Sequence, residues 1–462
     1  MDVEGDAGVE DDGRIRTGNL GTATAHAFTA AVGAGILALP WSMAQLGWIL
    51  GCIVLISFAL ITYFTAILLA DCYRTPDPVH GKRNYTYITA VRSLLGPTNE
   101  ILCAIMQYAL LWGTMIGYTV TTAISVAAVR RTTCFHANGQ HAKCGVSGNI
   151  YMLVFGVIQI VLSQFPNLEK VAFLSVFASA TSFAYAIIAL GLSIAKLFSN
   201  HHVKGTLMVA YSDVPEAASA KVWHVFQALG NIALAYTFSM ILLEIQDTLK
   251  SSPPENKVMK KATMFAIGGT TMFYITLGCM GYAAFGTNVA GNILAGFYHP
   301  YWLVVIANLC VILHIVGAYQ VFGQPIFAIN EKFLTTRFPA STFTTIYTIK
   351  LPCTKKSIYS FTLSKLLLRP LFVVVTTLLA MMFPFFNGIL GLLGAIAFWP
   401  LTVQFPLRMY TEQFKIKKWS CRWICFQLLS FVSLIVTLVS GIGSVASMLD
   451  SLKKAKLFHI NL

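Results

Sequence analysis

Long apolar runs separated by short polar stretches recur from one end of this chain to the other. A helix needs about 20 apolar residues to cross the roughly 30 Å hydrocarbon core of a bilayer. Only 11% of the 462 residues are charged, whereas soluble domains carry about 25%. The sequence therefore predicts an all-α integral membrane protein, with the bilayer as its solvent. The eleven expected spans are residues 22–48, 49–71, 100–128, 149–165, 170–198, 222–247, 262–286, 301–328, 370–385, 387–407 and 422–449.

The basic residues between these runs predict which ends face the cytosol. Lys and Arg are enriched in the short cytosolic loops of membrane proteins. With the N-terminus inside, the inside segments hold 23 of the 32 Lys and Arg residues. This bias explains the net charge of +14 without a nucleic-acid partner. An odd number of spans then places the C-terminal tail outside, although Lys453, Lys454 and Lys456 favour the opposite side.

The chain opens with an acidic stretch that holds six Asp and Glu residues within residues 1–12. It lacks the basic start and apolar core of a secretory signal, so we expect the first span to be retained. The expected organisation is a disordered cytosolic tail at 1–20, spans 1–5 at 21–198, an extracellular loop at 199–221, spans 6–10 at 222–407, and a cytosolic loop, span 11 and C-terminal tail at 408–462.

Two of the ten cysteines, Cys134 and Cys144, fall in a loop that this topology places outside. Disulfides form in such oxidising compartments, so a disulfide is the preferred interpretation. The same loop also offers His136 and His141, which leaves a zinc site as the alternative. The spacing matches no common zinc-finger pattern, and a loop with neither a disulfide nor a zinc site is the third alternative.

The first apolar run contains "AFTAAVGAGILALPWSMAQLGW", with Gly33, Gly35 and Pro40 near its middle. Both residue types weaken helices. An unpaired backbone group in lipid costs several kcal/mol, so a helix breaks at this depth only where a cavity, a ligand or other protein groups satisfy the backbone. The pattern favours a binding site, and close helix packing through small residues is the alternative.

A second weak point lies about 200 residues later, in the sixth run. This run reads "FQALGNIALAYTFSMILLEIQD" and carries polar and small residues near its middle: Asn231, Ala233, Ala235, Tyr236, Thr237 and Ser239. Corresponding weak points in the first span of each half are typical of inverted-repeat transporters. The two halves would be spans 1–5 and spans 6–10.

Several long stretches resemble the plant amino acid permeases of the amino acid/auxin permease family. They include "RTGNLGTATAHAFTAAVGAGILALPWSMAQLGWI", "DPVHGKRNYTYITAVRSLLG", "FQALGNIALAYTFSMILLEIQDTLKSSP" and "FPFFNGILGLLGAIAFWPLTVQFP". The resemblance covers about residues 14–450. It implies a LeuT-like fold, a 5+5 inverted repeat with broken spans 1 and 6 plus an eleventh span. It also implies proton-coupled uptake of amino acids across the plasma membrane of a plant cell.

The chain departs from the usual pattern of this family at three places. Ala34 stands where Ser is usual, which removes a hydroxyl from the break but keeps its backbone groups. Leu39-Pro40-Trp41 stands where the family usually has Leu-Ala-Trp. Asn231 stands where Asp is usual, and Asn cannot titrate, so one acid that could take part in proton coupling is missing.

The substrate of such a permease brings a carboxylate and an ammonium group. The half-helix that begins near Gly35 would present amide groups and a positive dipole end to the carboxylate. Carbonyl groups near the second break would suit the ammonium. Tyr118 lies midway along span 3, which faces the site by resemblance to the wider fold, and it either binds the carboxylate or packs. The expected substrate-binding residues are Gly33, Ala34, Gly35, Tyr118, Thr121, Ala233, Ala235, Tyr236 and Thr237.

Ionisable residues at membrane depth are candidates for function. His314 in span 8 and His26 in span 1 are the proton-coupling candidates, because imidazole titrates near pH 6.5. A neutral histidine bonded within the bundle is the alternative for both. Glu244 and Asp247 lie near the cytosolic end of span 6, where we expect them to form a gate with basic loop residues.

The sequence carries no P-loop, nucleophile motif or cluster of metal ligands at membrane depth, so we expect a secondary transporter and not an enzyme. We expect no cofactor, with the proton gradient as the energy source. The expected partners are free amino acids, protons and the lipid bilayer. The alternatives are an amino-acid sensor, which would bind without transport, and a channel or auxin-like carrier.

Overall fold

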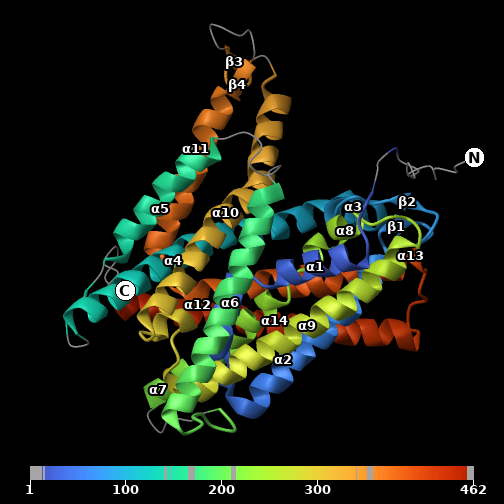
Figure 1. Cartoon of the computed structure of the whole chain (residues 1–462). Coiled ribbons are helices and arrows are strands. Elements are labelled where there is room, and N and C mark those ends of the chain that lie inside the picture. The colour runs from blue at the N-terminus through green and yellow to red at the C-terminus, as the bar shows by residue number, and fades with distance from the viewer. Residues whose placement is uncertain are drawn as a thin grey trace, which may run out of the picture. The chain divides into compact units, whose positions relative to one another are not determined.

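A computed structural model of the chain shows a mostly helical protein (Figure 1). It describes residues 13, 16–139, 142, 144–145, 147–164, 172–209, 215–339, 341–350 and 357–454. The α-helices are α1 (Leu20–Ala31), α2 (Leu39–Asp71), α3 (Tyr87–Leu95), α4 (Pro97–Asn138), α5 (Gly148–Ser163), α6 (Ala172–Asn200), α7 (Pro215–Ala235), α8 (Leu242–Gln246), α9 (Glu255–Phe285), α10 (Tyr301–Arg337), α11 (Leu363–Met382), α12 (Phe386–Ala397), α13 (Phe405–Gln413) and α14 (Cys421–Lys454).

Short 3₁₀ and π segments join or interrupt these helices. They are the 3₁₀ segments η1 (Ala34–Ala38), η3 (Ser239–Ile241), η4 (Gly286–Asn288) and η5 (Ile293–Gly296), and the π-helical segment η6 (Phe398–Gln404). Two antiparallel hairpins also occur, which an all-α prediction does not include. One pairs β1 (Arg74–Thr75) with β2 (Lys82–Arg83), and the other pairs β3 (Ile346–Lys350) with β4 (Ser357–Thr362). Both lie in polar segments between predicted spans, so the spans themselves are helical as expected.

Nine helical segments in the described part of the chain are long and apolar enough to cross a membrane, and Gly148–Ser163 is a shorter apolar helix. Eleven runs become nine long segments for two reasons. The α5 helix has only 16 residues, and the first two runs meet in α2, where Gly47 interrupts the helical conformation with φ = 78°. The predicted boundary between spans 1 and 2, at residues 48 and 49, lies beside this interruption.

Gly47 is required at this interruption by a close approach of the backbone. A Cβ added to Gly47 would lie 2.6 Å from the carbonyl oxygen of Met208. The amides of the next two residues leave the helical pattern and donate to the loop, Trp48 to Thr206 at 3.1 Å and Ile49 to Leu207 at 3.1 Å. The loop that follows α6 therefore supplies the hydrogen bonds that the helix gives up at its bend.

Several helices continue well beyond the apolar runs that predict them. The α4 helix ends at Asn138 and not near residue 128, and α10 ends at Arg337 and not near residue 328. Hydropathy marks only the part of a helix that lies in lipid. Polar residues such as Glu331 and Lys332 also have good helix propensity, so the helix does not end where the apolar run ends.

The chain divides into two compact units, and each draws on both predicted halves. The first unit comes from Met1–Leu110, Ala189–Ile293 and Asn387–Ser447, and the second from Leu111–Ile188, Leu294–Phe386 and Met448–Leu462. In the first unit α2 packs against α9 and α7, and α1 packs against α9. In the second unit α11 packs against α5 and α10 (Figure 1).

Candidate functional site

The first span is broken where the glycines predicted it. The α1 helix ends at Ala31, the next two residues leave the helical path, and the chain resumes as η1 before α2 begins. No side chain caps the start of η1. Pro40 occupies one of the first positions of α2, where the missing amide hydrogen costs little because no partner exists there. The break is thus built from glycine at its centre and proline just beyond it.

Open space adjoins both glycines of the break. A Cβ added to Gly33 or to Gly35 would meet no heavy atom within 4 Å. Glycines that serve helix packing behave differently in the same unit. A Cβ on Gly394 would clash with the carbonyl oxygen of Gly230, and one on Gly230 would clash with that of Gly391. Close packing therefore does not explain Gly33 and Gly35, while it does explain Gly230 on α7 and Gly394 on α12.

The sixth span is broken as well. The α7 helix ends at Ala235, and α8 begins only after a non-helical turn and the short η3 segment. The buried Tyr236 donates its hydroxyl to Thr271 Oγ1 at 3.1 Å, and the Thr237 hydroxyl donates to the Leu234 carbonyl at 2.7 Å. Ala34, Ala233 and Ala235 are buried. The two breaks predicted for spans 1 and 6 are therefore present, both in the first unit.

One side chain joins the two breaks. The hydroxyl of Tyr274, on α9, lies 2.6 Å from the carbonyl oxygen of Ala31 and 3.2 Å from that of Ala235. These carbonyls end α1 and α7, where the helices leave carbonyl groups without partners of their own. The Tyr274 side chain is fully buried, and its ring meets the Tyr236 ring edge-on at 5.4 Å. Nothing in the sequence marks Tyr274, because its place between the breaks depends on how α9 packs.

Asn231, a polar residue of α7, lies one turn before the second break. It is buried, and its Nδ2 donates to Asn387 Oδ1 at 3.4 Å. Its Oδ1 is buried without a hydrogen-bond partner among the described residues. A buried acceptor without a partner costs about 1–3 kcal/mol, so this oxygen favours a donor that arrives from outside the chain.

Asp247, at the far end of the broken span, is held by an ion pair. Its Oδ1 accepts from Arg16 Nη2 at 2.7 Å and from the Tyr73 hydroxyl at 2.6 Å. Burial, and then the hydrogen bond to Asp247, raise the pKa of the Tyr73 phenol well above its usual value, so Tyr73 stays a donor. Two backbone hydrogen bonds continue the contact: the Gly18 amide donates to the Thr248 carbonyl, and the Lys250 amide donates to the Gly18 carbonyl. The segment before α1 is thereby fastened to the end of α8.

Glu244 has a different environment from Asp247. Its Oε1 accepts from the amide of Tyr87 at 3.1 Å, at the start of α3. Its Oε2 is buried without a hydrogen-bond partner in the described part of the chain. Of the two gate candidates, Asp247 therefore has the basic partner, and Glu244 bonds to a helix N-terminus.

The remaining candidates lie elsewhere. His314 is buried in α10, and its Nδ1 lies 2.9 Å from the Ala178 carbonyl oxygen. In contrast, His26 is exposed on α1. Tyr118 and Thr121, on α4, belong to the second unit. The Thr121 hydroxyl donates to the Gly117 carbonyl of the same helix at 2.6 Å, so its proton is already in a hydrogen bond.

Cys134 and Cys144 form a disulfide in the structure. His136, one of the two histidines of the zinc alternative, stacks on the Tyr301 ring at 3.8 Å between centroids. The other, His141, lies outside the described residues. The structure therefore has a disulfide between these two cysteines.

Comparisons with known proteins identify the family of this chain. A family model described as "Transmembrane amino acid transporter protein" matches residues 16–449. Amino acid permease 8 of Arabidopsis thaliana is 50% identical over 454 residues, which cover 97% of this chain and 95% of that permease. Amino acid permease 1 of Arabidopsis thaliana is 49% identical over 455 residues, which cover 98% of this chain and 93% of that permease.

Two solved structures share the fold at low sequence identity. MhsT in complex with L-phenylalanine superposes with a TM-score of 0.52 at 11% identity, over 94% of this chain and 100% of MhsT. The inward-facing conformation of Mhp1 gives a TM-score of 0.50 at 14% identity, over 96% of this chain and 93% of Mhp1. The fold is therefore that of a LeuT-like membrane transporter. By its family match and its plant relatives, the chain belongs to the transmembrane amino acid transporter family, as a plant amino acid permease, and it is a transporter and not an enzyme.

Proposed function

We propose that this permease imports neutral amino acids together with protons across the plasma membrane, by alternating access. The observation that carries the proposal is the open space at Gly33 and Gly35, beside a broken helix that Tyr274 connects to a second break. Amide groups at the start of η1 would bind the substrate carboxylate, and carbonyl groups at the end of α7 would bind its ammonium group.

A preference for neutral substrates follows from the residues around the breaks. The candidate binding residues from Gly33 to Gly35 and from Ala233 to Thr237 carry no charged side chain. A substrate with a charged side chain would bring a third charge into a site without a counter-charge, which is costly away from water. Asn231 is also neutral, and its buried Oδ1 would accept a hydrogen bond from the substrate ammonium.

Two features support a cytosolic N-terminus. The Lys and Arg bias of the loops favours it, and it puts the Cys134–Cys144 disulfide on the oxidising side of the membrane. In this orientation the Arg16–Asp247 ion pair would act as part of a cytosolic gate. It would have to open before substrate leaves, which makes the segment before α1 part of the transport cycle.

Proton coupling would give the transporter its driving force. One charge that falls through 100 mV supplies about 2.3 kcal/mol. Since about 1.4 kcal/mol is a tenfold change in an equilibrium, this supports roughly 45-fold accumulation. A pH difference of one unit would add about another tenfold.

Uptake of radiolabelled amino acids by a transport-deficient host tests the proposal. A panel of neutral, acidic and basic amino acids should give saturable uptake that is greatest for neutral substrates and rises as external pH falls from about 8 to 5. Substrate binding to the purified protein without uptake by cells would instead favour the sensor alternative. Uptake that ignores both pH and membrane potential would refute coupling.

His314→Gln tests where the coupling proton binds. Glutamine keeps a neutral N–H donor on a side chain of similar size, while titration is lost. We expect this variant to bind substrate, to show a flattened pH dependence of uptake, and to accumulate substrate less against a gradient. His26→Gln is the matched control, because His26 is exposed, and it should have little effect. An unchanged pH profile and proton current per substrate in His314→Gln would make His314 structural.

A further inference from the structure

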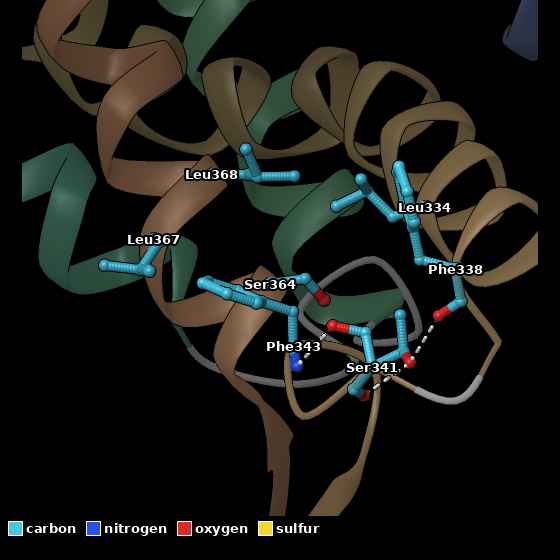
Figure 2. A pocket seen from close by; sticks show the side chains of 8 residues that line it. Leu334, Phe338, Ser341, Phe343, Ser364, Leu367 and Leu368 are labelled. Carbon is cyan, nitrogen blue, oxygen red and sulfur yellow. Dashed lines mark hydrogen bonds between the residues drawn. The ribbon is translucent and has the colours of Figure 1, made fainter.

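The second unit holds an apolar cavity far along the chain from the helix breaks. Its volume is about 430 Å³, within the range of ligand pockets. The last turns of α10 and the first turns of α11 line it, together with the loop between them (Figure 2). In Figure 2, Leu334 from α10 and Leu368 from α11 face the same space. The cavity is therefore a groove between the ends of two neighbouring helices.

The groove is lined mainly by apolar side chains, and its hydroxyl groups already form hydrogen bonds within the chain. Leu334, Phe338, Phe343, Leu367 and Leu368 supply its apolar lining. The hydroxyls in it are already bonded within the chain. Thr344 donates to the Ser341 carbonyl at 2.9 Å, and Ser364 pairs with the Thr362 hydroxyl at 2.7 Å. An alkyl chain fits such a surface, whereas a polar metabolite would lose its hydrogen bonds to water on entry.

The groove lies at the edge of the hydrocarbon layer. The α11 helix has 20 residues, about 30 Å at 1.5 Å per residue, which equals the thickness of the hydrocarbon core. Its first two turns, which carry Leu367 and Leu368, and the end of α10, which carries Leu334, adjoin the predicted spans 370–385 and 301–328, so the groove would lie at one membrane boundary. The exposed fractions of Phe338, Phe343 and Leu367 are 53%, 50% and 54%. Large apolar side chains this exposed are expected where lipid covers them.

Basic residues border the groove. Arg337 follows Leu334 by three residues on α10, and Lys365 precedes Leu368 by three on α11, so each cation neighbours a lining leucine. Glu331 is the only acid between residues 329 and 369, which hold seven Lys and Arg residues. Arg369 bonds to Glu331 at 2.9 Å, and Lys365 lies 3.5 Å from it. Arg337 is exposed and forms no ion pair with a described residue.

We propose that this groove binds an anionic phospholipid of the cytoplasmic leaflet, with an acyl chain between Leu334 and Leu368 and the net negative charge of the head group at Arg337 and Lys365. The inference rests on the cytosolic N-terminus of the proposed function, which puts the 329–369 loop, after the eighth span, on the cytosolic side, where anionic lipids are concentrated. The lipid would tie the end of α10 to the start of α11 within the second unit. A phosphate without acyl chains would lack the contact with the apolar lining.

Native mass spectrometry of the purified transporter in detergent tests this site without measuring transport. Phosphatidylserine and phosphatidylcholine with the same acyl chains, and glycerophosphoserine without chains, are titrated separately. We expect phosphatidylserine to bind most tightly and glycerophosphoserine least. Arg337→Gln should weaken phosphatidylserine binding about fivefold, and Arg337→Gln with Lys365→Gln about 30-fold, toward the phosphatidylcholine value. Lys332→Gln removes the same charge two positions before Leu334, on another face of α10, and should have little effect.

Leu368→Trp tests the acyl-chain contact separately. The larger side chain should fill the groove and weaken both phospholipids several-fold, while Leu366→Trp, at an exposed position outside the lining, should not. The charge variants change exposed or half-exposed groups, so they keep the proposal testable even if Leu368→Trp fails to fold. Equal binding of the two phospholipids to the parent protein would overturn the proposal, as would equal losses in Arg337→Gln and Lys332→Gln. Binding of glycerophosphoserine as tightly as phosphatidylserine would show a phosphate site and no lipid site.

Discussion

Replacing Gly35 by valine is expected to reduce amino acid uptake to background while the amount of transporter in the membrane stays near that of the parent. A Cβ at Gly35 meets no heavy atom within 4 Å, so the new side chain begins in open space. That space is where the substrate would meet the backbone of the break. The measurement is uptake of a labelled neutral amino acid, normalised to surface abundance.

Two other glycines give matched controls for this substitution. Gly268, exposed on α9, also has no heavy atom within 4 Å of an added Cβ, so Gly268→Val should keep both abundance and uptake. Gly394 is packed against the Gly230 backbone, so Gly394→Val should reduce abundance by preventing α7 and α12 from packing. If Gly35→Val retains uptake with unchanged apparent affinity, the break is not the substrate site.

Removing the hydroxyl of Tyr274 is expected to lower uptake about tenfold. Tyr274→Phe keeps the ring in its buried place but takes away the donor shared by the Ala31 and Ala235 carbonyls. A buried acceptor that loses its partner costs about 1–3 kcal/mol, and about 1.4 kcal/mol corresponds to tenfold. Both carbonyls lie at helix breaks, so losing this hydrogen bond should shift the backbone groups that form the candidate substrate site. Uptake and substrate affinity should therefore both change.

Tyr282→Phe is the matched control on the same helix. Tyr282 is also fully buried on α9, and its hydroxyl accepts from the Thr206 amide at 2.8 Å, in the loop that follows α6. Its loss should affect stability by a similar amount and leave substrate affinity unchanged. Equal changes in affinity in the two variants would mean that Tyr274 has only a structural role, and thermal unfolding of both proteins would show whether their stabilities match.

Much of the fold follows from residues that are close in sequence. A helix needs about 20 apolar residues to cross the bilayer, so the apolar runs locate the helices, although α4 and α10 continue about ten residues beyond their runs. Gly33, Gly35 and Pro40 weaken one of these helices whatever surrounds it, so the break in span 1 follows from local chemistry. The break in span 6 is less marked in the sequence, because alanine is a good helix former, so the polar residues among the small ones are its main indication.

Tertiary structure decided what local sequence cannot express. Gly33 and Gly35 border open space, whereas Gly230 and Gly394 lie against the backbone of a neighbouring helix. This difference depends on where the neighbouring helices lie, and the two kinds of glycine look the same in the sequence. Tyr274 reaches the two breaks only because α9 packs along α1 and α2. Arg16 finds Asp247 across 231 positions of the chain. The sequence by itself determined the membrane helices, the breaks and the family resemblance, since these depend on hydropathy and local backbone preference. Only the tertiary structure decided which side chains join those breaks, because hydrogen bonds and packing act between residues that the chain brings together from far apart.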